Sequence, residues 1–229
     1  MQPTYLPWAG YFNLIAQADR FYYLDDAQYE RGTWQQRNRI LRDGQPSWLT
    51  VPVRRERFGQ LIRDVQVDPL SPTWRRKHAE SIRYAYLRAP HRAALQPIVE
   101  TIMAPENVCL ADLNIALIDR LCTMLGISTP RARTSEMDLG LPRSHKLVEI
   151  CGRAGCDEYL STPGAAEYLT EDGFSKLTDV RLLFQDYNPG SYLQMGSKQF
   201  ISHLSIIDVI AHIGNKSAGA YVRNGSEGI

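Results

Sequence analysis

SHKLVEICGRAGCDEYLSTPGAAEYLTEDGFSKLTDVRLLF, residues 144–184, is the stretch that decides the fold class. Apolar residues recur at helical spacing over 144–154 and around 165–169, and short apolar runs lie at 159–160 and 180–184. Helices that alternate with short strands favour a parallel α/β arrangement. The sequence therefore predicts an α/β protein.

The segments on either side extend this pattern with a helical middle. Helical spacing predicts these helices: 10–17, one that starts at the Ser71 N-cap with Pro72 in its first turn, 93–102, 110–125 closed by Gly126, and 205–213 ended by Gly214. Strand-like runs are predicted at 21–24, at 48–53 after an Asp43-Gly44 turn, and at 61–67. We expect one compact mixed α/β unit over residues 1–229; a boundary near residue 130 is the alternative.

Composition and charge narrow the class of protein. With 44% apolar and 22% charged residues, the chain is typical of a soluble globular protein, and no run approaches the ~20 apolar residues of a membrane-spanning helix. Because the net charge is only +1, we expect neither a nucleic acid nor a membrane as partner. The opening residues lack the features of a secretory signal, so we expect a cytoplasmic protein.

The positive charges gather in the first half of the chain. Residues 1–100 hold 15 Lys and Arg against 10 Asp and Glu, which leaves 11 against 15 for the rest. The densest pieces are Arg37, Arg39 and Arg42; Arg54, Arg55 and Arg57; and Arg75, Arg76 and Lys77. They are either solvated surface or a site for a phosphorylated ligand or an acidic partner, because clustered guanidinium groups suit phosphate.

The cysteines and glycines argue against a metal or a familiar cofactor. Cys109, Cys122, Cys151 and Cys156 include no CxxC pair, so we expect no metal site, and the first three are predicted to be buried. No GxGxxG or GxxxxGK[ST] pattern occurs, which disfavours NAD and ATP sites of the familiar kinds. We therefore expect no cofactor.

The N-terminal segment QPTYLPWAGYF, residues 2–12, combines two prolines with several aromatic rings. Such rings present an apolar face and a polar tip, which suits either a ligand-lining wall or a cap on the core. We predict that the segment packs against residues 25–38 and forms one wall of the main pocket. The candidate substrate-binding residues in it are Gln2, Tyr5, Trp8 and Tyr11.

A second constellation begins with Asp25 and Asp26 at the end of an apolar strand. Asp26 is a candidate general base, since sites in α/β proteins often lie at strand ends. Directional donors and a ring for stacking follow it in the chain: Gln28, Trp34, Arg37 and Asn38. In the alternative interpretation, Asp26 pairs with Arg37 and the rest are turn residues.

His78 is the second candidate base. It shares a helical face with Trp74 and Ile82, so burial and the neighbouring positive charges should keep its imidazole neutral. We expect it to face the same cavity as Asp26 and Arg37; a structural histidine is the alternative. Further along, Ser205 to Asp208 has the spacing of a capping box, which would explain both of these polar residues by helix chemistry.

In their order along the chain, these motifs resemble the WbqC-like proteins of bacterial surface-polysaccharide and natural-product clusters. The motifs that carry the resemblance are residues 2–12, 24–29, Trp34 with 37–40, 48–53, His78, 89–90, 113–114, 125–127, 159–161, Tyr168 and 205–208. The resemblance implies work on an amino sugar, an amino-acid unit or a carrier-bound acyl group, and it adds Ser161 to the candidate binding residues. Met1 stands where the family carries a His or Ser, so we expect any role of that residue to be either absent from this chain or lost by truncation.

The resemblance and the residues together lead to three function hypotheses. The first is an acyl- or aminoacyltransferase that forms an amide on an amino sugar or related amine from a carrier-bound thioester, with Asp26 or His78 as base. The second is a binding protein for a glycan or a carrier protein, which would use the same aromatic and amide side chains for recognition. The third, a cysteine hydrolase, requires Cys151 or Cys156 to meet a histidine across the fold.

Overall fold

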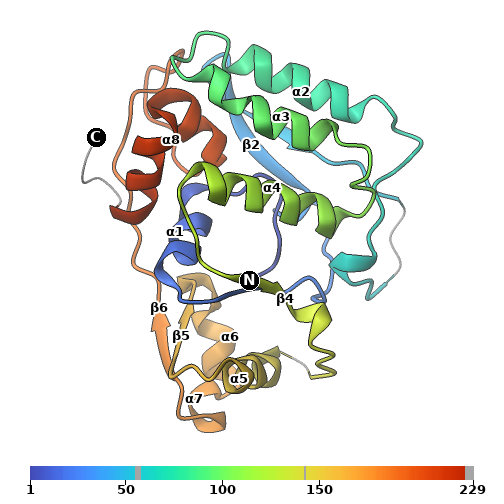
Figure 1. The fold of residues 1–229 in the computed structure, drawn as a ribbon, viewed down its shortest axis with the longest axis vertical. Coiled ribbons are helices and arrows are strands. Elements are labelled where there is room, and N and C mark those ends of the chain that lie inside the picture. The colour runs from blue at the N-terminus through green and yellow to red at the C-terminus, as the bar shows by residue number, and fades with distance from the viewer. Residues whose placement is uncertain (55–57, 142, 225–229) are drawn as a thin grey trace.

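The protein is described by a computed structural model that covers residues 1–54, 58–141 and 143–224, so Arg55 and Arg57 of the basic cluster lie outside the described residues. The prediction of a mixed α/β protein is confirmed (Figure 1). The helices are α1 (Ala9–Gln17), α2 (Trp74–Ala85), α3 (Gln96–Met103), α4 (Leu110–Met124), α5 (Arg143–Ala154), α6 (Ala166–Glu171), α7 (Phe174–Leu177) and α8 (Ile206–Asn224). The strands are β1 (Phe21–Tyr23), β2 (Arg37–Arg42), β3 (Gln45–Thr50), β4 (Arg131–Arg133), β5 (Glu158–Ser161) and β6 (Arg181–Phe184).

The described strands form small sheets of two strands each. β1 pairs with β4 and β5 pairs with β6, both in parallel, while β2 and β3 form an antiparallel hairpin. The hairpin turns at Asp43 and Gly44, both with positive φ, as the predicted turn requires. Parallel pairing of β5 and β6 confirms the arrangement expected from residues 144–184.

The main hydrophobic core lies among the N-terminal segment, the hairpin and the long helices. α1 packs against α8 and α3 packs against α4, and each contributes an apolar face to the core. Gly126 has a φ of +67°, so α4 is closed by a left-handed residue as expected. Among the described residues, no helix combines the length and the apolarity needed to cross a bilayer.

A second, smaller core holds α5, α6, α7, β5 and β6 together at one end of the molecule (Figure 1). Its buried members are Leu139, Leu147, Ile150, Ala165, Leu169 and Phe174. Tyr22 and Leu24, from the β1 region, pack against it and join it to the main body. The boundary near residue 130 stays a prediction.

Two predicted elements differ from the structure. Residues 61–67 contain a short 3₁₀ helix, Ile62–Asp64, and isolated bridges, because different segments meet them at single residues and no ladder forms. α2 begins at Trp74 instead of directly after Ser71. The Ser71 hydroxyl is used in a turn, where it donates to Asp68 at 3.0 Å, so it does not cap the helix.

The last helix also runs further than predicted. α8 continues through Asn224 across Gly214, whose φ of 79° and ψ of 166° mark a kink rather than an end. A Cβ at Gly214 would lie 3.1 Å from the His91 ring, so the kink also makes room for that ring. Glycine is favoured here for both reasons.

Candidate functional site

The N-terminal segment packs against residues 25–38, as predicted. The Tyr5 amide donates to the Trp34 carbonyl at 3.0 Å, and the Asn38 amide donates to the Leu6 carbonyl at 2.8 Å. The Gln35 amide donates to the Gln2 side chain at 2.8 Å. These long-range bonds fix the segment on the hairpin and carry Trp8 with it.

Of the predicted binding residues in this segment, Tyr5 and Tyr11 are core residues with 0% and 2% exposure. The Tyr11 hydroxyl donates to the Gln2 carbonyl at 3.1 Å, while the Gln2 side chain itself is exposed. Trp8 is partly exposed. The indole lies over Gly10, where a Cβ would come within 2.1 Å of the ring. Gly10 therefore lets Trp8 lie flat on α1.

The hairpin places alternate side chains on opposite faces, since side chains alternate along a strand. Asn38 and Ile40 of β2 are buried, while Arg37 and Arg39 point to the outer face. Trp48 of β3 is paired with Arg39 in the strand register and shares that face. We call the resulting patch the tryptophan–arginine surface; its members are Trp8, Trp34, Arg37, Arg39, Trp48 and His203.

Aromatic rings and guanidinium groups interleave on this surface. The Trp34 and Trp48 rings are 47% and 45% exposed, and their centroids are 5.4 Å apart. The Arg37 guanidinium lies 4.3 Å from the Trp48 ring, and that of Arg39 lies 5.7 Å from both rings. Such cation–π contacts hold the guanidinium groups in place beside the rings.

His203 extends the surface toward the N-terminal segment. Its carbonyl accepts a hydrogen bond from Arg39 at 3.4 Å, and its ring stacks on Trp8 with centroids 4.6 Å apart. Its φ of +58° is an uncommon conformation that histidine tolerates better than most residues. The Nδ1 atom lies 2.9 Å from the Ser202 hydroxyl, and within the described chain no residue bonds to Nε2. An exposed imidazole with a free nitrogen can accept a proton.

The two arginines of this surface are only partly satisfied. Their Nε atoms are shielded from solvent and have no hydrogen-bond partner among the described residues. In that same part of the chain, neither guanidinium group pairs with a carboxylate. The alternative in which Arg37 pairs with Asp26 is therefore wrong, because Asp26 pairs with Lys146 at 2.9 Å. Unpaired guanidinium groups beside rings favour an anionic ligand.

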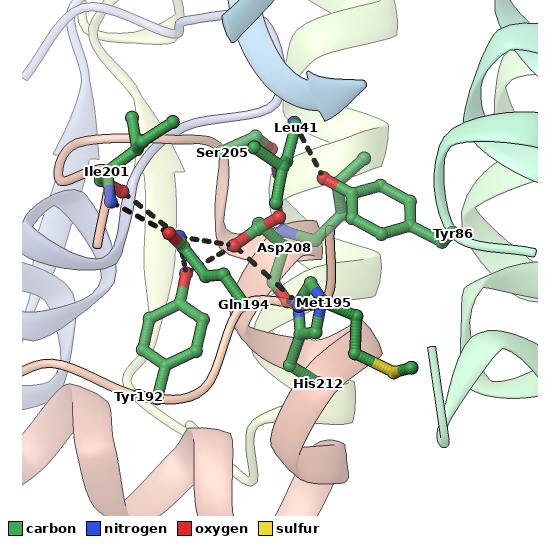
Figure 2. Close-up of polar contacts among 10 residues, drawn as sticks. Leu41, Tyr86, Tyr192, Gln194, Met195, Ile201, Ser205, Asp208 and His212 are labelled. Atoms are coloured by element: carbon green, nitrogen blue, oxygen red, sulfur yellow. Dashed lines mark hydrogen bonds and ion pairs between the residues drawn. The ribbon is translucent and has the colours of Figure 1, made fainter. Parts of the chain in front are cut away.

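A buried network of polar side chains surrounds Asp208 of α8 (Figure 2). One oxygen of the Asp208 carboxyl accepts hydrogen bonds from Tyr192 at 2.5 Å and Gln194 at 2.9 Å. His212 lies one turn further on α8, where its Nδ1 donates to the Asp208 carbonyl and its Nε2 accepts from the Met195 amide. Burial raises the pKa of the Asp208 carboxyl, although His212 and the two donors act in the opposite direction.

The predicted capping box at residues 205–208 is half present: the Ser205 hydroxyl accepts from the Ile207 amide at 3.5 Å, but the Asp208 side chain does not return to Ser205. The Ser205 amide donates to the Arg39 carbonyl at 2.9 Å, so it is not available to Asp208. The Asp208 side chain turns instead to Tyr192 and Gln194. Local spacing suggested a cap, but a partner on β2 takes the amide that the cap would use.

Gln194 links the Asp208 network to the loop before His203. Its amide group donates to the Ile201 carbonyl at 3.0 Å, and its side-chain oxygen accepts from the Ile201 amide at 2.8 Å (Figure 2). Ile201 is thus held at both backbone groups, two residues before His203. The buried Asp208 therefore positions a residue of the exposed surface through Gln194.

The two predicted bases have partners of their own. Asp26 accepts from Thr134 at 2.6 Å and from Lys146 at 2.9 Å. His78 lies 2.8 Å from the Tyr5 hydroxyl and also bonds to the Thr50 backbone, and burial lowers the pKa of His78 to about 4. The imidazole is neutral as expected, and its partners on both sides are those of a structural histidine. A cavity shared by the two residues stays a prediction.

The remaining predicted binding residues lie in different surroundings. Gln28 is exposed and its carbonyl accepts from Gln35 at 3.3 Å. Asn38 is buried, with its amide on the backbone of the N-terminal segment. Ser161 is buried at the end of β5, and its carbonyl accepts from the Gln185 amide. Trp8, Trp34 and Arg37 are the predicted residues that the structure brings together on one surface.

The cysteines are buried as predicted, except for Cys156, which is partly exposed. Burial raises the pKa of Cys122 and of Cys151 to about 12 and also raises that of Cys109. The Cys156 thiol faces the Cys151 carbonyl at 3.5 Å. A thiol with a raised pKa is a poor nucleophile at neutral pH.

The expectation that residues 2–12 wall the main pocket is wrong. A cavity of about 620 Å³ lies between α3 and α4 instead, and a smaller one of about 280 Å³ lies between α2 and α3. Neither is lined by the N-terminal segment. The rings of the segment are buried in the core or, like Trp8, contribute to an open surface.

Sequence reasoning missed Trp48 and His203 as site residues, and it named Arg39 only as a member of a basic cluster. Arg39 and Trp48 could have been found from residues 37–50, since a six-residue strand, a tight turn and a return strand place Arg37, Arg39 and Trp48 on one face. No local signal marks His203. Its place beside Trp8 depends on contacts between segments about 195 residues apart.

Comparisons with known proteins give one family and one curated relative. The chain matches the WbqC-like protein family over residues 2–219. It is 34% identical over 217 residues to the uncharacterized protein Rv1507c of Mycobacterium tuberculosis (strain ATCC 25618 / H37Rv), a match that covers 93% of this chain and 92% of the relative. No solved structure matches the chain.

Proposed function

Because the chain belongs to the WbqC-like protein family, we propose that it is an acyl- or aminoacyltransferase that forms an amide on an amino sugar or related amine. The acyl group comes from a thioester on a carrier protein. One observation supports this function above the others: an exposed imidazole, that of His203, lies on the same surface as unpaired guanidinium groups and open tryptophan rings.

The reaction needs a proton acceptor and groups that hold the two substrates. The amine nitrogen bonds to the thioester carbonyl carbon, the carbon–sulfur bond breaks, and the carrier thiol leaves. His203 takes the proton from the attacking amine at its free Nε2 and returns it to the departing sulfur. Arg39 and Arg37 hold the anionic part of a substrate, and the tryptophan rings position its apolar faces.

Asp26 and His78 remain the alternative proton acceptors in this proposal. Asp26 is held by Thr134 and Lys146, and His78 by Tyr5, so each would have to exchange a partner before it could accept a proton. His203 needs no such exchange. We therefore assign the base role to His203 first.

A binding protein for a glycan or a carrier is the second candidate function. The exposed Trp34 and Trp48 rings would serve recognition equally well without any reaction. A cysteine hydrolase has less support, since burial raises the pKa of Cys151 to about 12, which disfavours the thiolate.

The test is transfer to an amine. The full chain is incubated with acyl-carrier thioesters and a panel of amino sugars, and the amines are followed by mass spectrometry. We expect an amide product whose rate falls at least 100-fold in His203→Gln, as is typical for loss of a general base. The matched control is His145→Gln on α5, an exposed histidine away from this surface, which should retain the rate.

Each other outcome points to one of the alternatives. A rate that survives in His203→Gln but is lost in Asp26→Asn would assign the base to Asp26. Binding of the amine or carrier without any product, in the wild type and both variants, would support the binding protein.

A further inference from the structure

From the geometry of the tryptophan–arginine surface, we infer that the amine acceptor is an amino sugar carried on a nucleoside diphosphate. This inference rests on the proposed function and names the substrate class of its site.

The two guanidinium groups have the spacing for two adjacent anionic groups. Arg37 and Arg39 are two residues apart on β2, so their Cα atoms lie roughly 7 Å from each other on the same face. Neither forms an ion pair within the described chain, and neither side chain is fully buried. A diphosphate presents anionic oxygens to both groups at once, and guanidinium binds phosphate in a directional manner.

The rings favour a ligand that also carries a flat group. Trp34 and Trp48 are both nearly half exposed and lie beside the two cations. Stacking of a nucleobase on an exposed aromatic ring stabilises complexes with single-stranded nucleic acids. A free sugar would leave the guanidinium groups unpaired, and the single phosphodiester of a carrier's pantetheine arm would engage them with one charge and no base.

The order of groups along the surface matches the order in such a ligand. Trp34 and Trp48 contact the arginines, Arg39 reaches the His203 carbonyl, and His203 stacks on Trp8. A base on the paired tryptophans and a diphosphate on the arginines would place the sugar at His203 and Trp8. The sugar amine then lies beside the imidazole that accepts its proton in the proposed reaction.

The test measures binding in the absence of any acyl donor. Titration calorimetry and tryptophan fluorescence on the full chain use UDP and GDP as probes. Uridine and pyrophosphate represent the nucleoside part and the diphosphate part of UDP. We expect UDP to bind at least tenfold more tightly than uridine or pyrophosphate. The affinity should fall as the salt concentration rises, because salt screens exposed charges.

The variants assign that binding to this surface. Arg37→Gln, Arg39→Gln and Trp34→Ala should each weaken UDP or GDP binding at least tenfold. Arg42→Gln is the matched control, because Arg42 ends the same strand but is exposed, pairs with Asp43 and lies over Tyr84. It should change the affinity less than twofold.

Three results would overturn the inference: no binding of UDP or GDP, pyrophosphate binding as tightly as the nucleotides, or equal affinity in the Arg39→Gln and Arg42→Gln variants. These outcomes are separable from the proposed function. Tight nucleotide binding without amide formation would refute the transferase and keep the ligand class. Acylation of a free amino sugar without nucleotide binding would support the transferase and refute the ligand class.

Discussion

The tryptophan–arginine surface and the Asp208 network meet at Ser205, yet they differ in how far their charged groups are buried and paired. In the network, the buried Asp208 carboxyl has donors from Tyr192 and Gln194. On the surface, Arg37 and Arg39 lie against exposed rings and lack a carboxylate partner in the described chain. Both regions contain charged groups and aromatic rings, so composition alone does not separate them.

The difference teaches which region can bind a ligand and which maintains the fold. A buried network resists change, because the loss of one member leaves its partners unpaired, and in this one only the Asp208 Oδ1 atom has no hydrogen-bond partner among the described residues of the network. An exposed surface with unpaired cations gives up little stability and keeps its hydrogen-bond donors for a partner. Changes in the network should therefore cost stability, and changes on the surface should cost binding.

The largest expected effect is the loss of the network's central acid. Asp208→Ala removes the acceptor of the Tyr192 hydroxyl and one of the acceptors of the Gln194 amide, which should lower the free energy of unfolding by about 3 kcal/mol. Urea denaturation measures it. Asp186→Ala, at an exposed position, is the control and should stay within about 0.5 kcal/mol of wild type. Equal stability of the two variants would end the distinction between the regions.

The next effect concerns pH and the buried His78. Burial lowers the pKa of His78 from 6.5 to about 4, so between these values the unfolded chain binds a proton that the folded chain does not. Stability should therefore fall as the pH falls through this window, by about 2 kcal/mol between pH 7 and pH 5. Urea denaturation at both pH values should show that the His78→Gln variant lacks this loss of stability between pH 7 and pH 5.

The matched control for that measurement is the exposed His145. His145→Gln should keep the full acid sensitivity of the wild type. If the His78 variant were as acid-sensitive as the His145 variant, the buried imidazole would not be the source of the pH dependence.

A smaller effect on stability is expected at Gly10, which supports Trp8 of the tryptophan–arginine surface. Gly10→Ala places a Cβ 2.1 Å from the Trp8 indole, so it should destabilise the protein by about 1.5 kcal/mol and displace Trp8 from His203. Gly152→Ala on α5 has nothing within 4 Å and should instead stabilise by about 0.5–1 kcal/mol. Thermal unfolding compares the two; a stabilised Gly10→Ala would show that Trp8 does not depend on this close approach.

The smallest expected effect on stability is on the surface itself. Arg39→Gln removes a cation without a carboxylate partner, so the free energy of unfolding should change by no more than about 0.5 kcal/mol. Urea denaturation of this variant, run beside Asp208→Ala, sharpens the comparison. A loss as large as that of Asp208→Ala would mean that Arg39 maintains the fold.

Local patterns predicted most of the regular elements. The helical spacing of 10–17 and 110–125 and the glycine at position 126 led to α1 and α4 with ends within one residue. The strand predicted at residues 61–67 was wrong, because a strand needs a partner strand and this segment pairs only with single residues of other described segments. Trp8, Trp34 and Arg37, which the sequence selected as binding residues, lie on one surface, while their role in binding stays a prediction and their link to His203 was not foreseen.

The sequence by itself determined the fold class, the buried thiols and the packing of the N-terminal segment, because periodicity and residue type act over a few neighbouring residues. Only the tertiary structure decided the roles of Asp208 and His203. The first lost its expected cap because the Ser205 amide bonds to Arg39. The second became a surface residue beside Trp8 because the chain returns there after about 195 residues. Such contacts arise between segments whose separation in sequence carries no local signal.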